Sequence, residues 1–274
     1  MGRPGGRRAP GHIEQLPFSV VQRDATTDGI EFRAFEDARV RVMTEENVVM
    51  HDMFGAANTS PNPTSTPAGP QAYLAELGPG FVEHAHFHNV DQFQVFFGGG
   101  DAFFQRHSVS KMLLQYADAF ATYGPFGAGE TTLGLYTLRS RASGLRAYMP
   151  QDRDKMTHRG LRQRSVDLVS YVERVPGPSP VIEAVLPPEQ DGLAAYWIDL
   201  PPGADATAPE ADGAGQFHCV VSGSVQAGGQ TFGPMSLGWI AAGPATPTVG
   251  FRCASDGPAS VLVLQLPHPT VPLD

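Results

Sequence analysis

Three histidines stand at alternate positions in the segment Gly80–Gln92. If residues 81–88 form a strand, His84, His86 and His88 point to one face of it, because side chains alternate along a strand. His84 and His88 are then ~13 Å apart, too far for one ion whose bonds to nitrogen are about 2.1 Å long. Neighbours two positions apart, at roughly 6.6 Å, can share an ion. One adjacent pair is therefore expected to bind a metal, and the third histidine to lie at the rim or support a ligand.

Gln92 can add an oxygen to such a pair. The turn at Asn89–Asp91 reverses the chain, so Gln92 begins the next strand beside the histidines. Two imidazoles and one oxygen, with positions left open, suit Fe(II), Mn(II), Ni(II), Cu(II) or Zn(II), and the residue types do not choose among them. A neutral amide is a weak ligand, so Gln92 either binds the ion or orients a bound water or substrate.

Short strands with frequent turns must position these residues. The chain has 274 residues, of which 31 are Gly and 25 are Pro, and this composition favours strands joined by tight turns over a helical bundle. The strands expected in the first half are Gln71–Leu77, Phe81–His88, Gln92–Phe97, Ala102–His107, Lys111–Tyr116, Phe120–Tyr123 and Thr132–Arg139. Those expected in the second half are Ala194–Leu200, Gln216–Val221, Ser224–Ala227, Gly238–Ala241 and Ser260–Leu266. Such a pattern predicts sandwiches or barrels.

The two halves resemble each other. Gln92–Gly99 and Gln216–Gly223 share Gln-Phe, an apolar run and a final glycine at an offset of 124 residues, which indicates a duplicated domain. The predicted organisation is a partly disordered arm over 1–30, a barrel with the site over 31–140, a connector over 141–192 and a second barrel over 193–274. We expect residues 58–70, rich in Pro, Thr, Ser and Asn, to form a loop whose role the sequence does not assign.

The histidine segment is similar to the first motif of the cupin superfamily. That motif is Gly, five residues, His-x-His, three or four residues, Glu, six residues and Gly. Here Gly80, His86, His88, Gln92 and Gly99 keep every spacing, with Gln in place of Glu. The resemblance selects His86 and His88 as the metal pair and leaves His84 outside it. It also implies an all-β fold with two cupin-type double-stranded β-helix (jelly-roll) barrels in tandem, a bicupin.

The second cupin motif is matched only in part. Pro125-Phe126-Gly127 and two further residues precede Glu130, where the family has its last histidine ligand, and Ala119 replaces a glycine. The resemblance therefore supplies Glu130 as a fourth ligand or no fourth ligand at all. His86, His88, Gln92 and Glu130 together carry the same −1 charge as three histidines and one glutamate. A solvent-facing turn residue is the alternative for Glu130.

The second barrel is expected to be degenerate. At the offset of 124 residues, Glu210 and Asp212 stand where His86 and His88 stand in the first barrel, and two acids in a loop are usually solvated. This barrel is expected to serve packing or dimerisation. In the first barrel, further residues that can line the pocket are Gln94, Phe96, His107, Tyr116, Tyr123 and Tyr136.

The leading functional hypothesis is a metal-dependent enzyme that acts on a small organic substrate, with a non-heme iron-type oxygenase as its first form. His86 and His88 would anchor one divalent metal, with Fe(II) favoured over Mn, Ni and Zn, while Gln92 and Glu130 would act as ligands and catalytic groups. The alternatives are a non-redox metal-dependent isomerase, lyase or cyclase, a non-catalytic small-ligand-binding barrel, and metal-free acid–base catalysis by Glu130 with a pocket histidine.

Charge and hydropathy limit the other partners. The formal net charge is −9, and the one arginine-rich stretch, Arg153–Arg164, is interrupted by an acid, so we expect no nucleic-acid binding. No apolar run reaches the ~18 residues of a membrane span, and no apolar stretch follows the basic residues 1–11 as in a signal peptide. A cytoplasmic protein, acting as a homodimer, is the expectation.

Overall fold

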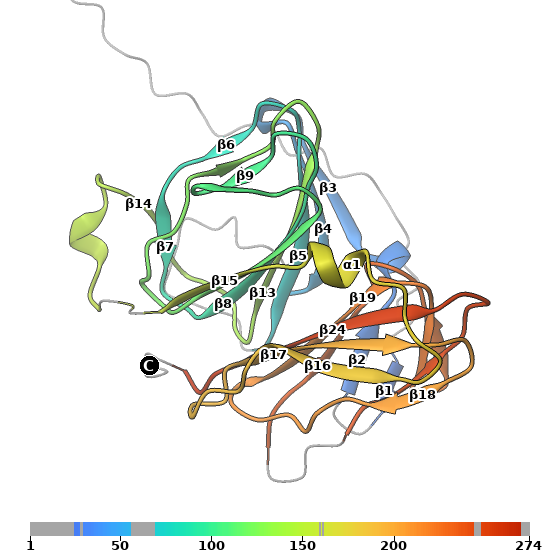
Figure 1. Ribbon diagram of the computed structural model, residues 1–274. Coiled ribbons are helices and arrows are strands. Elements are labelled where there is room, and N and C mark those ends of the chain that lie inside the picture. The colour runs from blue at the N-terminus through green and yellow to red at the C-terminus, as the bar shows by residue number, and fades with distance from the viewer. Residues whose placement is uncertain are drawn as a thin grey trace, which may run out of the picture.

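The computed structural model describes residues 25–27, 30–55, 69–158, 160, 162–243 and 248–269. Most of the predicted arm and of the predicted loop over 58–70 lies outside these ranges. The described residues form two β-barrels, each built from a seven-stranded antiparallel sheet facing a smaller one (Figure 1). The all-β prediction, with two jelly-roll barrels in one chain, is confirmed. Within the described ranges, no helix is long and apolar enough to cross a membrane.

The N-terminal barrel carries the predicted site. Its larger sheet runs, in spatial order, β15 (Gln163–Asp167), β11 (Met112–Ala117), β8 (Gln92–Phe97), β13 (Leu133–Arg139), β5 (Gln71–Leu77), β4 (Val48–Phe54) and β3 (Arg39–Met43). The facing sheet runs β10 (His107–Ser108), β9 (Phe103–Phe104), β12 (Phe126–Gly127) and β6 (Val82–Glu83). A two-stranded ribbon of β14 (Arg146–Tyr148) and β7 (His86–His88) completes the wall.

The C-terminal barrel repeats this order. Its larger sheet runs β1 (Ala25–Thr27), β2 (Ile30–Arg33), β22 (Leu237–Ile240), β19 (Gly215–Ser222), β24 (Ala259–Leu266), β17 (Ala194–Leu200) and β16 (Val181–Leu186). The smaller sheet runs β18 (Asp205–Thr207), β23 (Gly250–Cys253), β20 (Val225–Ala227) and β21 (Gln230–Phe232). The order β22-β19-β24-β17-β16 matches β11-β8-β13-β5-β4 strand for strand. Gln92 and Gln216 therefore lie on equivalent strands, as the repeat predicted.

One strand from the N-terminal part of the chain pairs with the C-terminal barrel. Strand β2, assigned by sequence to the first barrel from residue 31, pairs with β22 of the second barrel (Figure 1). Its Phe32 is 2% exposed in that barrel's core. Of the predicted connector, β15 extends the first barrel through β11 and β16 extends the second through β17. Each segment covers an edge that would otherwise expose unpaired backbone groups.

Strand alternation divides β8 between two environments. Phe93 and Val95 point out of the N-terminal barrel into an apolar core shared with Trp197 and Phe217 of the other barrel. The next position along, Phe96, belongs to the interior core of its own barrel, and Gln92 and Gln94 lie on the same face of the strand. Packing between the barrels thus fixes the strand whose other face lines the site.

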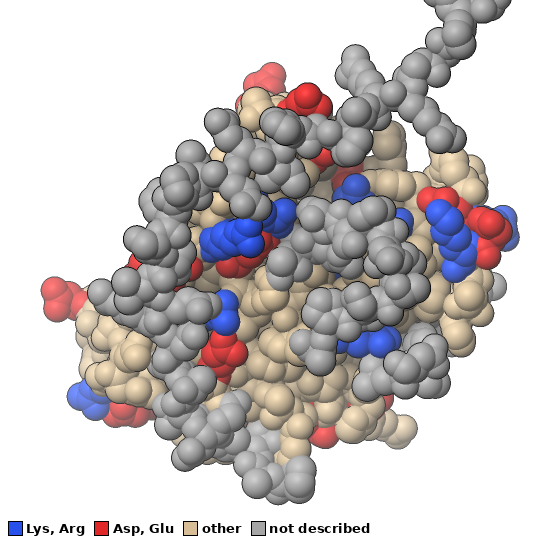
Figure 2. Space-filling model, turned by 180° about the vertical axis from the view of Figure 1, so that it is seen from behind, with Lys and Arg blue, Asp and Glu red and all other residues tan. Residues whose placement is uncertain are grey.

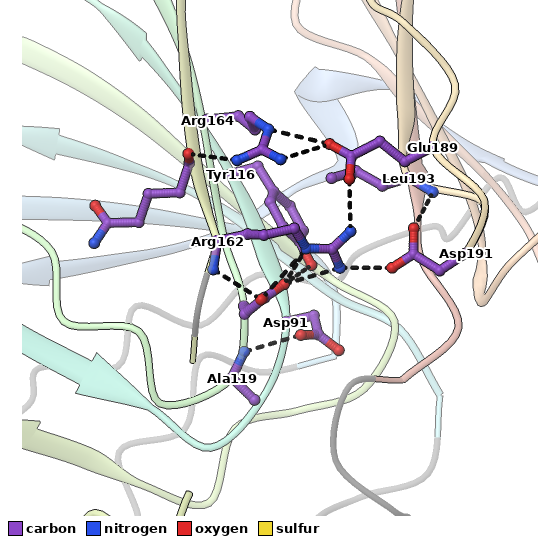
Figure 3. A network of polar contacts seen from close by, with 10 residues as sticks. Asp91, Tyr116, Ala119, Arg162, Arg164, Glu189, Asp191 and Leu193 are labelled. Carbon is purple, nitrogen blue, oxygen red and sulfur yellow. Dashed lines mark hydrogen bonds and ion pairs between the residues drawn. The ribbon is translucent and has the colours of Figure 1, made fainter. Parts of the chain in front are cut away.

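An ion network spans the two barrels (Figure 3). The guanidinium of Arg162, just before β15, contacts Asp118 of the N-terminal barrel at 3.0 Å. It also contacts Glu189 at 3.0 Å and Asp191 at 2.6 Å, on the loop that leads into β17. Arg164 adds a second contact to Glu189 at 3.0 Å. One side chain, 18% exposed, therefore ties the connector to both barrels.

The surface carries both basic and acidic side chains. On the face shown in Figure 2, the visible Lys and Arg side chains lie in small groups beside Asp and Glu side chains.

Candidate functional site

A cavity of about 900 Å³ occupies the N-terminal barrel. Its polar lining includes His86, His88, Gln94, Tyr123, Thr137, Arg139, Glu83, Arg146 and Tyr148. Its apolar lining includes Met43, Val48, Met50, Ala75, Leu77, Phe81, Phe126 and Leu135. A volume of this size suits a small organic ligand.

The strand register grades the interior from polar to apolar. One row across β5 and β13 pairs Gln71 with Arg139, and the register of β8 sets Gln92 beside that arginine. The next row consists of Tyr73, Thr137, Gln94 and Gln115. The row after that consists of Ala75, Leu135, Phe96 and Leu113. Inward side chains recur every second residue. The lining of the barrel therefore changes from a guanidinium and amides to hydrocarbon over four residues of each strand.

The two predicted histidines lie side by side on the opposite wall. Both belong to β7, both are buried, and their ring centroids are 5.3 Å apart with nearly perpendicular planes. The Nδ1 of His86 lies 2.7 Å from the backbone oxygen of His84. The Nδ1 of His88 lies 2.6 Å from the backbone oxygen of Leu145. A carbonyl oxygen only accepts, so each Nδ1 carries the proton and each Nε2 carries a lone pair.

Both imidazoles are held neutral. Burial lowers the pKa of His86 below its ordinary value, against a smaller raising effect of the bond to His84. Burial lowers the pKa of His88 further, and the positive charge of Arg139 adds to the effect. Neutral imidazoles with free Nε2 lone pairs are the form that binds metal ions. Histidine ligands commonly have the other ring nitrogen fixed by a carbonyl in this way.

The side-chain oxygen of Gln92 is bound to Arg139 in the structure. Its Oε1 accepts a hydrogen bond from Nε of Arg139 at 2.9 Å, and its Nε2 has no partner among the described residues. Arg139 also donates from Nη1 to Oε1 of Gln71 at 2.7 Å. Gln92 as a metal ligand stays a prediction, and in the structure its side-chain oxygen accepts a hydrogen bond from a cation.

Glu130 does not join the histidines. Strand β12 runs antiparallel to β6, and the isolated pairing of His86 with Tyr123 continues that ladder. The residue opposite His86 is therefore Tyr123, and the chain moves away from the histidines as it continues to Glu130. Glu130 is exposed, outside the cavity lining, and its backbone N–H donates to Asp101 at 2.8 Å. Glu130 as a fourth ligand or an acid–base catalyst stays a prediction, which this placement outside the cavity lining does not favour.

Two neutral side-chain oxygens at the cavity lack a hydrogen-bond partner among the described residues. Gln94 Oε1 and Tyr123 Oη are buried and have no hydrogen-bond partner within the described part of the chain. The ring of Tyr123 lies 4.5 Å from that of His86, centroid to centroid. Burial raises the pKa of Tyr123 above its ordinary value, so the phenol keeps its proton. Within the described ranges, no three His, Cys, Asp or Glu side chains form a metal-binding group.

Arg139 is the charged residue that the sequence reasoning missed. It is 3% exposed, lines the cavity, and forms no ion pair with any carboxylate of the described residues. Alternation along β13 gave a usable signal, because Leu133, Leu135, Thr137 and Arg139 share one face. Three of these line the barrel interior as apolar or neutral residues, and the fourth places a charge there.

Of the other residues predicted to line the pocket, some line the cavity and others do not. Gln94 and Tyr123 line the cavity as anticipated, whereas His107 is exposed on β10. Tyr116 and Tyr136 are buried in the core between the barrels. In the C-terminal barrel, Glu210 and Asp212 lie outside its buried core.

Comparisons with known proteins address the fold. No family model and no curated protein matches the sequence. The bacterial pirin YhhW of Escherichia coli, solved in complex with nickel(II), matches with a TM-score of 0.56 at 14% identity, over 87% of this chain and 99% of that one. An arginine-to-alanine mutant of Bacillus subtilis oxalate decarboxylase OxdC matches with a TM-score of 0.58 at 10% identity, over 89% and 78%. A provisionally named dioxygenase of Nostoc punctiforme matches with a TM-score of 0.56 at 11% identity, over 88% and 86%. At these identities the likeness establishes the fold, which is that of a two-barrel cupin.

Proposed function

We propose that this protein with a two-barrel cupin fold binds one divalent transition metal ion in its N-terminal barrel and acts there on a small organic substrate. The observation that carries the proposal is the pair of buried histidines. His86 and His88 are both neutral, both have Nδ1 hydrogen-bonded to a backbone carbonyl, and both leave Nε2 free in a cavity of about 900 Å³. Two structural neighbours support the choice of a divalent ion, since the pirin contains nickel(II) and a study of OxdC describes Mn(II) centres.

The donor set fits such an ion. Two imidazole nitrogens are ligands for Fe, Mn, Ni, Cu and Zn, and the unpartnered oxygens of Gln94 and Tyr123 are neutral donors at the same cavity. None of these four groups is a carboxylate. These four groups alone therefore do not compensate the charge of a divalent ion, and they leave room for substrate as a further ligand; the carboxylate of Glu83 lies 3.8 Å from Nδ1 of His86.

The chain's own residues orient the histidine ligand, form the cavity wall and supply a hydrogen-bond donor. The bonds from His88 Nδ1 to Leu145 at 2.6 Å and to the Ser143 hydroxyl at 3.0 Å fix the ring plane. Tyr123 keeps its phenolic proton and can donate it as a hydrogen bond to a bound oxygen. Strand β14 pairs with β7 and, together with the residue before it, contributes Leu145, Arg146 and Tyr148 to the cavity wall (Figure 1). The bound ion would supply Lewis-acid or, as iron, redox chemistry.

An Fe(II)-dependent oxygenase is the specific form of the proposal. We expect metal-free protein, reloaded without oxygen, to bind one equivalent of Fe(II), Mn(II) or Ni(II) by calorimetric titration. Iron-loaded protein should then consume dioxygen, with a panel of small organic acids, faster than the His86→Ala/His88→Ala variant. Binding of the ion without dioxygen consumption would leave a non-redox isomerase, lyase or cyclase. No binding of any of these ions would refute the metal function.

A second function is favoured by one observation. Arg139 places a positive charge beside His88, and charge repulsion weakens the binding of a cation there. A barrel that binds an anionic small molecule without metal, as a sensor or carrier, would have this arrangement. It predicts that ligand affinity is the same in metal-free and metal-loaded protein.

A further inference from the structure

We propose that the ligand of the N-terminal cavity is a small organic acid, whose carboxylate pairs with Arg139 while its apolar body lies against the hydrocarbon end of the barrel. The inference deepens the proposed function by naming its substrate class. The anion site itself stands on Arg139 and its surroundings, and it does not need the metal.

Arg139 is a buried cation without a counter-ion among the described residues. Its hydrogen bonds there run from Nε to Gln92 and from Nη1 to Gln71, and both acceptors are neutral amides. Nη2 has no hydrogen bond in the same part of the chain, and the side chain lines the cavity. A buried charge is costly unless it is paired. Two amides thus hold the guanidinium in place without cancelling its charge.

Arg41 shows the ordinary arrangement in the same barrel. It is the other fully buried arginine of the described residues, at 8% exposed, and it also lines the cavity. Its Nε and Nη2 donate to the two carboxylate oxygens of Asp52 at 2.7 and 2.8 Å. This bidentate pairing is the preferred geometry for arginine with a carboxylate. At Arg139 a ligand can supply the carboxylate that the chain supplies to Arg41.

The second barrel provides an internal comparison. Gln216 on β19 pairs with Gln265 on β24, at the register where Gln92 faces Arg139. There Gln216 Nε2 donates to Gln265 Oε1 at 2.7 Å, so an amide pair satisfies the same position. The fold therefore does not require an arginine here. The charge occurs in the barrel that has the large cavity.

The remaining lining suits the rest of such a molecule. Two rows further along the strands the wall becomes Ala75 and Leu135, and Met50 and Phe126 extend the apolar lining. Lys155 and Arg146 also line the cavity, but Lys155 pairs with Asp152 at 2.7 Å and Arg146 approaches Glu83 at 3.6 Å. Arg139 is thus the cavity's unpaired cation among the described residues, and it lies at the polar end.

The test compares acids with their uncharged amides. Benzoate and octanoate, each against benzamide and octanamide, would be titrated calorimetrically into chelator-treated protein and into protein reloaded with Mn(II). We expect each acid to bind about 10- to 100-fold more tightly than its amide, as for a hydrogen-bonded charge pair. We expect the preference to vanish in Arg139→Gln, which reproduces the Gln216–Gln265 pair. It should persist in Arg106→Gln, which changes an exposed arginine of the same barrel.

A second variant, Gln92→Glu, keeps the proposal testable if Arg139→Gln does not fold. Gln92→Glu keeps the arginine and gives it a carboxylate partner, so it should also abolish the acid preference in metal-free protein. Equal affinity for acids and amides in the wild type, unchanged preference in both variants, or no binding of any probe would overturn the proposal. If the protein prefers acids over amides but binds no metal, only the metal function is refuted. If it binds metal but shows no preference for acids, only the anion site is refuted.

Discussion

The Nε of Arg139 donates to Oε1 of Gln92 across 2.9 Å, at the position where the cupin motif has an acidic metal ligand. A glutamate at residue 92 would neutralise this arginine. Glutamine orients it and leaves its charge intact. The departure from the motif is therefore coupled to a buried cation 47 residues further along the chain.

Gln92→Met tests whether Gln92 supports Arg139 or binds metal. The variant removes one of two acceptors from a buried guanidinium, so we expect the free energy of unfolding in urea to fall by about 2 kcal/mol. Metal content should not change. Gln105→Met, at a half-exposed position, is the matched control and should change stability by less than about 0.5 kcal/mol. A folded Gln92→Met protein that had lost its metal would identify Gln92 as a ligand.

Glu130→Gln should leave the site intact. The side chain is exposed and lies outside the cavity lining, so we expect unchanged metal stoichiometry and a change in stability below about 0.5 kcal/mol. Elemental analysis and urea unfolding measure both. Loss of metal from this variant would restore Glu130 as the fourth ligand.

Arg162→Met should loosen the contact between the barrels. The change removes the arginine partner of Asp118, whose side chain is 7% exposed, and of Asp191, whereas Glu189 keeps its contact with Arg164. Since Arg162 is itself partly exposed, we expect a loss of about 2 kcal/mol, below the value for a fully buried pair. Arg164→Met, at 40% side-chain exposure with one partner, should cost less than about 1 kcal/mol. Equal effects of the two substitutions in urea unfolding would contradict the assigned role of Arg162.

His218 should make the protein sensitive to acid. Burial lowers its pKa from 6.5 to about 3. His218 is therefore protonated in the unfolded chain below pH 6.5, but in the folded protein only below about pH 3. Stability therefore falls as pH drops through this window, by about 2 kcal/mol at pH 5 for this one group. His218→Leu should show a shallower loss between pH 7 and 5 than wild type. His107→Leu, at an exposed position, should not, and equal slopes for all three proteins would refute the assignment.

The sequence predicts what depends on local periodicity. Alternation alone places His86 and His88 on one face, and the turn after His88 sets Gln92 at the start of the next strand. Local periodicity does not predict the position of a residue that depends on pairing between segments far apart in the sequence. The place of Glu130 depends on the ladder between β6 and β12, which fixes the residue that faces His86, and spacing within one motif does not report that register. Likewise, nothing within residues 30–33 indicates that they pair with residues 237–240.

Arg139 falls between these cases. Its place on the inward face of β13 follows from the same alternation as the histidines. Its lack of an acidic partner among the described residues emerges only when Gln71 and Gln92 are brought beside it by two further strands.

The metal content of purified protein decides whether His86 and His88 form a metal site. Wild type, the His86→Ala/His88→Ala variant and the control His84→Ala would be reloaded without oxygen and analysed by mass spectrometry. His84 is exposed and outside the pair, so its side chain should not matter. We expect about one equivalent of a divalent transition metal in wild type and His84→Ala, following the two-histidine donor set, and none in the double variant. Metal-free wild type after reloading, or metal retained in the double variant, would contradict it.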